Sequence, residues 1–272
     1  MSREWLINEV LPYAIDVAYG ASEIIMNVYH SGFEYEIKSD DSPVTIADKK
    51  ADAFIRERIS KKYCNHAFLT EESEDDKSRL NCKYIWIIDP LDGTKNFINR
   101  DGEFAINIAL VEGHTPVLGI VMIPNTGEMY YAVKDYGAYY VRSKGDKPTQ
   151  ISVSKKVKDL VLLTSVFHVN DEEIAVANKY REYIKEERKV GSAIKACLIA
   201  RGLAEVSFRF NANTKEWDTC APQIIVEEAG GFFTEPNGNP ITYNRVDVYN
   251  RNGFSIYNLE ENNYAKKYLE NK

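Results

Sequence analysis

The sequence has few of the side chains that commonly build disulfide frameworks or zinc sites. Its 272 residues include four histidines and four cysteines, and the cysteines lie far apart without a Cys-x-x-Cys pair. We therefore expect no disulfide framework and no structural zinc, and reduced thiols in a cytoplasmic protein are the simplest interpretation. A chain of this length buries roughly three quarters of the surface that its unfolded form exposes, so it needs neither disulfides nor a metal ion to fold.

Long apolar runs and an excess of basic residues are also missing. No uncharged apolar segment approaches the roughly 18 residues that a membrane-spanning helix needs, and the first residues do not resemble a signal peptide. Acidic residues outnumber basic ones by 41 to 34, for a formal net charge of −7. That balance argues against a partner such as a nucleic-acid polymer or an anionic membrane, although it allows a local basic pocket for a small anion.

The first part of the chain, residues 1–148, has the pattern of helices followed by antiparallel strands. Apolar residues at spacings of three and four between Leu6 and Val28 predict one amphipathic helix, and a second is expected to begin near Thr45. From Tyr84 the pattern changes to short apolar runs separated by glycines and turn motifs, with strands expected at 84–88, 104–111, 117–123, 129–133 and 138–141. This order predicts helices packed on an antiparallel sheet.

The second part, residues 149–272, alternates between strands and helices. Strands are expected at 160–165 and 203–208 and near Phe232 and Phe254, and helices at 171–187, 192–201, 219–229 and from Glu260. Such alternation predicts an α/β subdomain. The whole chain is therefore expected to combine α+β and α/β architecture in two closely packed subdomains.

Carboxylates stand next to turn or helix-start signals at four places, and each has an ordinary structural explanation. These places are Asp48, Glu71 with Glu72, Asp89 with Asp92, and Asp218. Asp48 follows Thr45 at capping-box spacing, and Asp218 precedes a helix start with Pro222 in its first turns. The run that Glu71 opens is typical of a solvated acidic loop, and Asp89–Gly93 of a turn.

The pair Asp89 and Asp92 also has a chemical interpretation. A buried apolar strand, 84–88, ends in one aspartate and is followed three residues later by another, just before Gly93 and Thr94. Two carboxylates beside free backbone N–H groups offer hard oxygen ligands for Mg²⁺ and donors for an anion. A divalent metal next to a phosphate is what metal-assisted phosphoryl chemistry requires.

Four motifs in this order resemble a known family. The segment Trp86–Phe97, with its Asp-Pro-Leu-Asp-Gly-Thr core, is similar to the signature of the lithium-sensitive, Mg²⁺-dependent inositol monophosphatase superfamily. Glu216–Pro222 followed by Glu228–Gly231 resembles the second signature of that superfamily, and Ser42–Asp48 and Leu69–Ser73 are smaller matches. The resemblance implies a layered α-β-α-β-α sandwich.

Within the superfamily, several segments resemble the 3′(2′),5′-bisphosphate nucleotidase branch: Lys95, the segments 99–110 and 190–200, and Trp217–Thr219. Enzymes of that branch remove the 3′-phosphate from adenosine 3′,5′-bisphosphate, and often from its sulfated relative, in sulfur metabolism. The chain departs from the branch at Asn96–Phe97, which is closer to inositol phosphatases, in the loop 210–216, and at 166–168, where Val-Phe-His replaces Arg-Ser-His. An inositol monophosphatase or broad sugar phosphatase is therefore the alternative. A non-catalytic binding protein is disfavoured, because every expected carboxylate and Thr94 are present.

The resemblance also implies roles for single residues. Glu71, Asp89 and the carbonyl of Leu91 would bind one Mg²⁺, and Asp89, Asp92 and Asp218 a second, with Glu71 helping to hold a third. Thr94 and Asp48 would activate the attacking water. The phosphorylated nucleotide would contact Glu71, Leu91, Asp92, Gly93, Thr94, Ser165, His168, Gly191, Ser192, Lys195 and Asp218. A monomer and a homodimer are both compatible with the sequence.

Overall fold

The structure is a computed structural model that describes residues 2–38, 43–167 and 169–272. Ser42 and His168, which the sequence analysis named, lie outside the described residues. Within these ranges, no helix combines the length and the apolar character that a membrane span requires.

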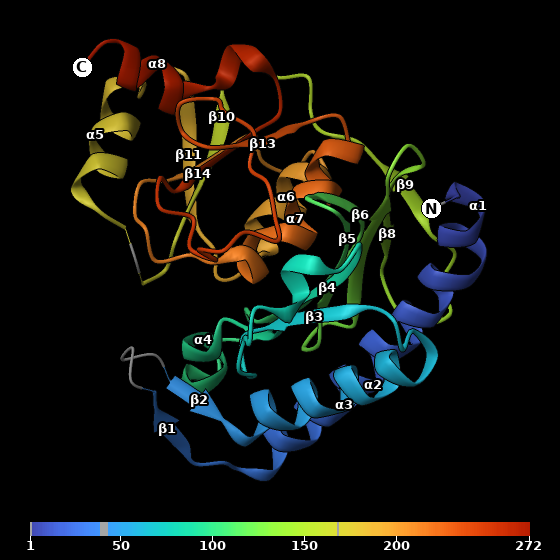
Figure 1. Cartoon of the computed structure of the whole chain (residues 1–272). Coiled ribbons are helices and arrows are strands. Elements are labelled where there is room, and N and C mark those ends of the chain that lie inside the picture. The colour runs from blue at the N-terminus through green and yellow to red at the C-terminus, as the bar shows by residue number, and fades with distance from the viewer. Residues whose placement is uncertain (1, 39–42, 168) are drawn as a thin grey trace.

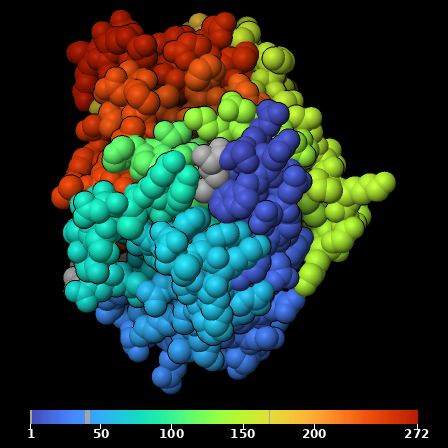
Figure 2. Space-filling view, turned by 45° about the vertical axis from the view of Figure 1, so that its right-hand side comes forward, coloured from blue at the N-terminus to red at the C-terminus, as the bar shows by residue number. Residues whose placement is uncertain are grey.

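The elements form five layers in which two sheets alternate with three layers of helices (Figure 1). One sheet has seven strands in the order β3-β4-β5-β6-β7-β8-β9, and the other has five in the order β11-β10-β12-β14-β13. The predicted α-β-α-β-α sandwich is confirmed. Figure 2 shows the part built from the C-terminal residues stacked against the part built from the N-terminal residues.

The seven-stranded sheet is antiparallel except for its first pair, β3 and β4, which run parallel. Its last strand, β9, ends at Ile151, so the sheet continues past residue 148, where the sequence analysis places the boundary between the two parts. The strands are β3 (Ala67–Thr70), β4 (Tyr84–Asp92), β5 (Ala105–Glu112), β6 (Thr115–Ile123), β7 (Glu128–Val133), β8 (Gly137–Val141) and β9 (Thr149–Ile151).

Two long helices cover one face of this sheet, as the apolar periodicity predicts. Their buried side chains pack against alternate residues of the central strands, including Trp86 and Ile106. The covering segments are α1 (Arg3–Trp5), the π-helical turn Leu6–Val10, α2 (Leu11–Ser31) and α3 (Ile46–Lys62). Between α2 and α3 along the chain, β1 (Tyr35–Ile37) and β2 (Pro43–Thr45) pair as a two-stranded antiparallel sheet.

The five-stranded sheet begins with three parallel strands, β11, β10 and β12, and continues with two antiparallel ones. The prediction of one helix over 171–187 is wrong, because the helix ends at Lys179 and Ile184–Lys189 form β11. Five charged and exposed residues follow Ile184, a pattern that protects a sheet edge but does not alternate as a strand usually does. The strands are β10 (Leu160–Thr164), β11 (Ile184–Lys189), β12 (Val206–Arg209), β13 (Phe232–Thr234) and β14 (Phe254–Tyr257).

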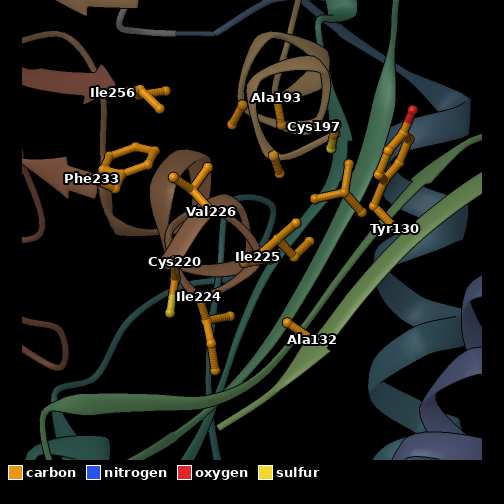
Figure 3. Close-up of a cluster of buried hydrophobic side chains, with 14 of the residues drawn as sticks. Tyr130, Ala132, Ala193, Cys197, Cys220, Ile224, Ile225, Val226, Phe233 and Ile256 are labelled. Carbon is orange, nitrogen blue, oxygen red and sulfur yellow. The ribbon is translucent and has the colours of Figure 1, made fainter. Parts of the chain in front are cut away.

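Helices α6 (Ile194–Ala200) and α7 (Glu216–Glu228) fill the layer between the two sheets (Figure 3). Cys220, Ile224, Ile225 and Val226 of α7 pack between Tyr130 on one side and the strands of the second sheet on the other. The outer layer holds α5 (Asp171–Lys179) and α8 (Tyr264–Glu270), while α4 (Thr94–Asn99) and the 3₁₀ turns Ser78–Asn81 and Glu260–Asn262 lie in connections.

A row of small residues lets α7 lie close to the seven-stranded sheet. Ala109, Gly119 and Ala132 are neighbours across β5, β6 and β7. A Cβ atom at Gly119 would lie 2.5 Å from Cγ2 of Ile224 and 2.7 Å from the carbonyl oxygen of Ala221, both in α7. The absence of a side chain at this position therefore sets the distance between helix and sheet.

We expect Gly119→Ala to lower the free energy of unfolding by about 1–3 kcal/mol, because the added methyl group overpacks a rigid interface. Thermal unfolding followed by circular dichroism should show a Tm several degrees lower. Gly113→Asn is the control, since Gly113 has open space around it and a φ of +63° that asparagine tolerates. Equal Tm values for both variants would contradict the assigned packing.

Candidate active site

Strand β4 does not end at Asp89, as the sequence analysis expects, but continues through Pro90 and Leu91 to Asp92. The pairing of β4 with β5 shifts register between Asp89 and Asp92, and this irregularity accommodates Pro90, which cannot donate to the ladder. The N–H of Leu91 donates to Oδ1 of Asp89 at 3.0 Å. The irregular strand end therefore directs two carboxylates toward the space between the sheets.

The third carboxylate of this cluster comes from the first turn of α7. Asp218 caps its own helix by accepting the N–H of Lys215 at 2.5 Å. Carboxylate oxygens of Asp89, Asp92 and Asp218 all lie within 4.8 Å of one another. The fold thus brings Asp218 together with Asp89 and Asp92, which lie more than 120 positions earlier in the chain.

Crowding and burial disfavour the charged forms of these groups. Burial raises the pKa of Asp89 well above its ordinary value, and repulsion from Glu71, Asp92 and Asp218 adds to the rise. Burial and repulsion from Asp92 and Glu71 raise the pKa of Asp218 to about 8. Lys195 opposes the rise at Asp92, and the N–H and charge of Lys215 oppose it at Asp218. Three carboxylates crowded in this way fit a divalent cation with a preference for oxygen ligands, such as Mg²⁺.

Glu71 lies at the wall of the same site but has a different partner. Its Oε1 is 3.2 Å from Nζ of Lys38, which also pairs with Glu72 at 2.5 Å. The acidic run is therefore only partly the solvated loop that its composition suggests, since the side chain of Glu72 is 6% exposed.

Asp48 and Thr94 form the pair that the sequence analysis names as catalytic. The Thr94 hydroxyl lies 3.0 Å from Oδ1 of Asp48 and 3.2 Å from the carbonyl oxygen of Leu91, and it can donate to either. The other carboxylate oxygen of Asp48 accepts from the N–H and hydroxyl of Thr45, which completes a capping box at the start of α3. The capping role and the contact with Thr94 thus use different oxygens of one carboxylate.

A cavity of about 640 Å³ opens beside these groups. Its volume is within the range that small-molecule sites occupy. The lining includes every described residue that the sequence analysis assigns to substrate contacts: Glu71, Leu91, Asp92, Gly93, Thr94, Ser165, Gly191, Ser192, Lys195 and Asp218. Asp48 reaches the site through Thr94.

One further cation at the cavity escaped the sequence analysis. Arg209, at the end of β12, is 9% exposed, and its Nε has no hydrogen-bond partner within the described part of the chain. Burial lowers its pKa, while Glu173, Asp218 and Asp92 oppose that effect. The available signal was a basic residue directly after an apolar strand, at the end of a parallel strand where α/β sheets place ligands.

Lys195, which is half-buried, is a second cation at the cavity. Its Nζ donates to the carbonyl oxygens of Ser192 and Val190 at 2.8 and 3.1 Å. Burial lowers its pKa to about 8, so the ammonium group remains mostly charged at neutral pH. Together with Arg209 it supplies positive charge on the side of the cavity that the second sheet forms.

A carboxylate cluster that is at least half-buried, a hydrogen-bonded Thr–Asp pair and basic groups around one cavity are the features expected of the site of a metal-dependent phosphatase. Comparison with known sequences agrees with this class. The chain belongs to the inositol monophosphatase family, whose sequence model matches residues 6–269.

Relatives within the family are similar over most of their length. The chain is 35% identical to the 3′(2′),5′-bisphosphate nucleotidase CysQ of Salmonella typhimurium over 91% of its own residues and 99% of that protein. The CysQ of Escherichia coli strain K12 is 32% identical with the same coverage. The crystal structure of CysQ from Bacteroides thetaiotaomicron superposes with a TM-score of 0.79 at 33% identity, covering 90% of this chain and 96% of that one.

We expect Asp218→Asn to stabilise the metal-free protein at pH 8 while weakening its response to Mg²⁺. Because the folded state raises the pKa of Asp218 to about 8, it holds a proton that the unfolded chain has released above about pH 4. The stability of the metal-free wild type therefore falls as pH rises from about 4 to 8.

The measurement is Tm at pH 5 and pH 8, with chelator and with Mg²⁺. In chelator, the Tm of the wild type should be lower at pH 8 than at pH 5. Added Mg²⁺ should raise the Tm, and the increase should be larger at pH 8. The variant should show a smaller pH effect and a smaller gain from the metal. Asp171→Asn, in the exposed first turn of α5, serves as the control. A wild-type Tm that rises with pH in chelator would contradict the assignment.

Proposed function

We propose that this chain hydrolyses the 3′-phosphate of adenosine 3′,5′-bisphosphate, and of its sulfated relative, with Mg²⁺ bound at the carboxylate cluster. The observation that carries the proposal is the shared cavity, which is lined by the cluster Asp89–Asp92–Asp218 and by two cations, the half-buried Lys195 and the buried Arg209. A substrate with two separated anionic groups is complementary to such a cavity. The CysQ relatives, named as nucleotidases of this specificity, support the same substrate.

Two or three Mg²⁺ ions are part of the proposal. Asp89, Asp92 and Asp218 would hold them, with the carbonyl of Leu91 and the carboxylate of Glu71 as further oxygen donors at the cavity wall. Bound there, Mg²⁺ would neutralise the phosphate, lower the pKa of a water molecule and stabilise the charge on the leaving oxygen.

The protein groups would then orient the water and receive its proton. With the Thr94 proton directed to Asp48 at 3.0 Å, the threonine oxygen keeps a lone pair for the proton of the attacking water. As that proton moves to Thr94, the threonine proton moves to Asp48, so the pair acts as one base. The backbone N–H groups of Gly93 and Thr94 would hold phosphate oxygens during in-line attack, and no phosphoenzyme forms.

The structure gives a reason to set aside one argument for the alternative, an inositol or sugar phosphatase. The Asn96–Phe97 pair resembles inositol phosphatases, but Phe97 is fully buried and packs against Tyr29, Phe33 and Phe104. Its identity therefore follows from core packing. The nearby Asn96 donates to Asp101 at 2.8 Å, which holds the connection after α4.

The proposal is tested by phosphate release from adenosine 3′,5′-bisphosphate, inositol 1-phosphate and fructose 1,6-bisphosphate, each with Mg²⁺ and with chelator. We expect strong preference for the nucleotide, complete dependence on Mg²⁺, and a loss of at least about 10³-fold in kcat for Asp89→Asn, because the cluster then lacks the charge that holds the metal. Preference for inositol 1-phosphate would keep the metal site and reject the nucleotide. No release from any substrate would favour a non-catalytic binding protein.

We expect Arg209→Ala to reduce the preference for adenosine 3′,5′-bisphosphate over 3′-AMP by about 10- to 100-fold, mainly through KM. The reason is that a buried guanidinium contributes a charge-assisted hydrogen bond only to the substrate that carries the 5′-phosphate. The measurement is the ratio of kcat/KM for the two nucleotides.

Two further variants make this ratio decisive. Arg209→Lys should retain part of the preference because it keeps the charge, and Arg142→Ala, at an exposed arginine outside the cavity lining, should leave the ratio unchanged. An equal loss on both nucleotides would show that Arg209 only supports the fold.

A further inference from the structure

The turn 190–193, which connects β11 to α6, is anchored to the part of the chain that builds the seven-stranded sheet. The N–H of Gly191 donates to Oε2 of Glu103 at 2.7 Å, and the N–H of Ala193 (labelled in Figure 3) donates to Oδ2 of Asp92 at 2.6 Å. Asp92 ends β4, and Glu103 lies in the connection between α4 and β5. Two carboxylates from one half of the site therefore hold a turn of the other half.

Lys195 forms hydrogen bonds with the carbonyl groups of the same turn. Its ammonium donates to the carbonyl oxygens of Val190 and Ser192, at 3.1 and 2.8 Å. Ser192 itself has a φ of +47°, a left-handed conformation that is unfavourable at residues other than glycine. Because such a conformation persists only where surrounding contacts enforce it, the bonds at Gly191 and Ala193 maintain the geometry that places the ammonium.

The main chain of Glu103 also lies against two glycines of the site. A Cβ atom would lie 2.8 Å from the carbonyl oxygen of Glu103 if it were added at Gly191, and 3.0 Å from it if added at Gly93. At Gly191 the same Cβ would lie 2.7 Å from Nδ2 of Asn96. Glu103 is thus packed between the turn beside the carboxylate cluster and the turn that holds Lys195.

We propose that Glu103 is a positioning residue that sets the place of Lys195, and so of the second phosphate, relative to the reacting phosphate. The inference rests on the proposed function. Glu103 is not part of the described cavity lining, so it acts through the turn at Gly191 rather than on the substrate. Burial lowers the pKa of Lys195, and the carboxylates of Asp92 and Glu103 oppose that effect. Glu103 therefore also helps to keep the ammonium charged.

The test is the ratio of kcat/KM for adenosine 3′,5′-bisphosphate to that for 3′-AMP, measured at pH 7. Glu103→Ala leaves the N–H of Gly191 without its acceptor, and the turn that holds Lys195 is then free to relax. Since a hydrogen bond to a charged group is among the stronger ones, we expect this ratio to fall by at least about fivefold, mainly through KM for the bisphosphate. Glu103→Gln keeps an acceptor oxygen and should retain most of the ratio.

Glu228→Ala is the matched control. The carboxylate of Glu228 accepts the N–H groups of Asp135 and Gly137, both at 2.8 Å, in a turn outside the cavity lining. Both alanine variants should lower the Tm, but only Glu103→Ala should lower the ratio. A ratio that is unchanged in Glu103→Ala, or lowered equally in both variants, would overturn the inference.

Binding of AMP is measured by calorimetry in parallel, because this readout does not require turnover. Chelator is present, so AMP cannot bind through a metal ion. Glu103→Ala should weaken AMP binding by at least about fivefold, while Glu103→Gln and Glu228→Ala should not. If the wild type hydrolyses no bisphosphate but Glu103→Ala selectively weakens AMP binding, the proposed function fails and the positioning role stands. If the wild type prefers the bisphosphate and Glu103→Ala keeps both the ratio and AMP binding, the function stands and the inference fails.

Discussion

The constraint on which the structure depends is the crowding of Asp89, Asp92 and Asp218, three like charges held within 4.8 Å. In the absence of a cation this arrangement is unfavourable, and the raised pKa values express that cost. The fold supplies the compensation through buried packing: the carboxylates come from an irregular strand end in one sheet and from α7, which packs between both sheets. The stability of the scaffold thus maintains the electrostatic strain that a divalent cation relieves.

Each aspartate of the site is held in the same way. One carboxylate oxygen accepts a backbone N–H: Thr45 for Asp48, Leu91 for Asp89, Ala193 for Asp92 and Lys215 for Asp218. Such bonds fix the orientation of a carboxylate and favour its charged form. At Asp48, the second oxygen faces Thr94. The capping bond from the N–H of Thr45 therefore also orients the Asp48 carboxylate toward Thr94. A structural role in capping and a functional role are thus compatible in the same residue.

The apolar periodicities predicted an antiparallel-sheet part and an α/β part, and the resemblance of the motifs to a known family implied the layered sandwich that the structure confirms. The sequence was insufficient where contacts between distant segments determine the secondary structure. The strand Ile184–Lys189 has no apolar alternation, and only its pairing with β10 distinguishes it from a continued helix. Local patterns also indicated a turn at Asp89–Asp92, where the sheet accommodates an irregular strand instead. Arg209 was missed for a related reason: its burial beside Asp92 and Asp218 follows from contacts between distant segments.

The topology of the second sheet explains why substrate groups converge there. From β10 the chain passes through α5 to β11 on one side, and then through α6 to β12 on the other side of β10. Since α6 lies between the sheets and α5 lies in the outer layer, the connections diverge around the end of β10 and leave a crevice. Ser165 and Phe167 lie at that crevice, with Gly191 and Arg209 beside them. The seven-stranded sheet contributes most of the groups that would bind metal. The five-stranded sheet contributes the groups that would distinguish one phosphate ester from another. Helix α7 packs between the two sheets and fixes their relative position.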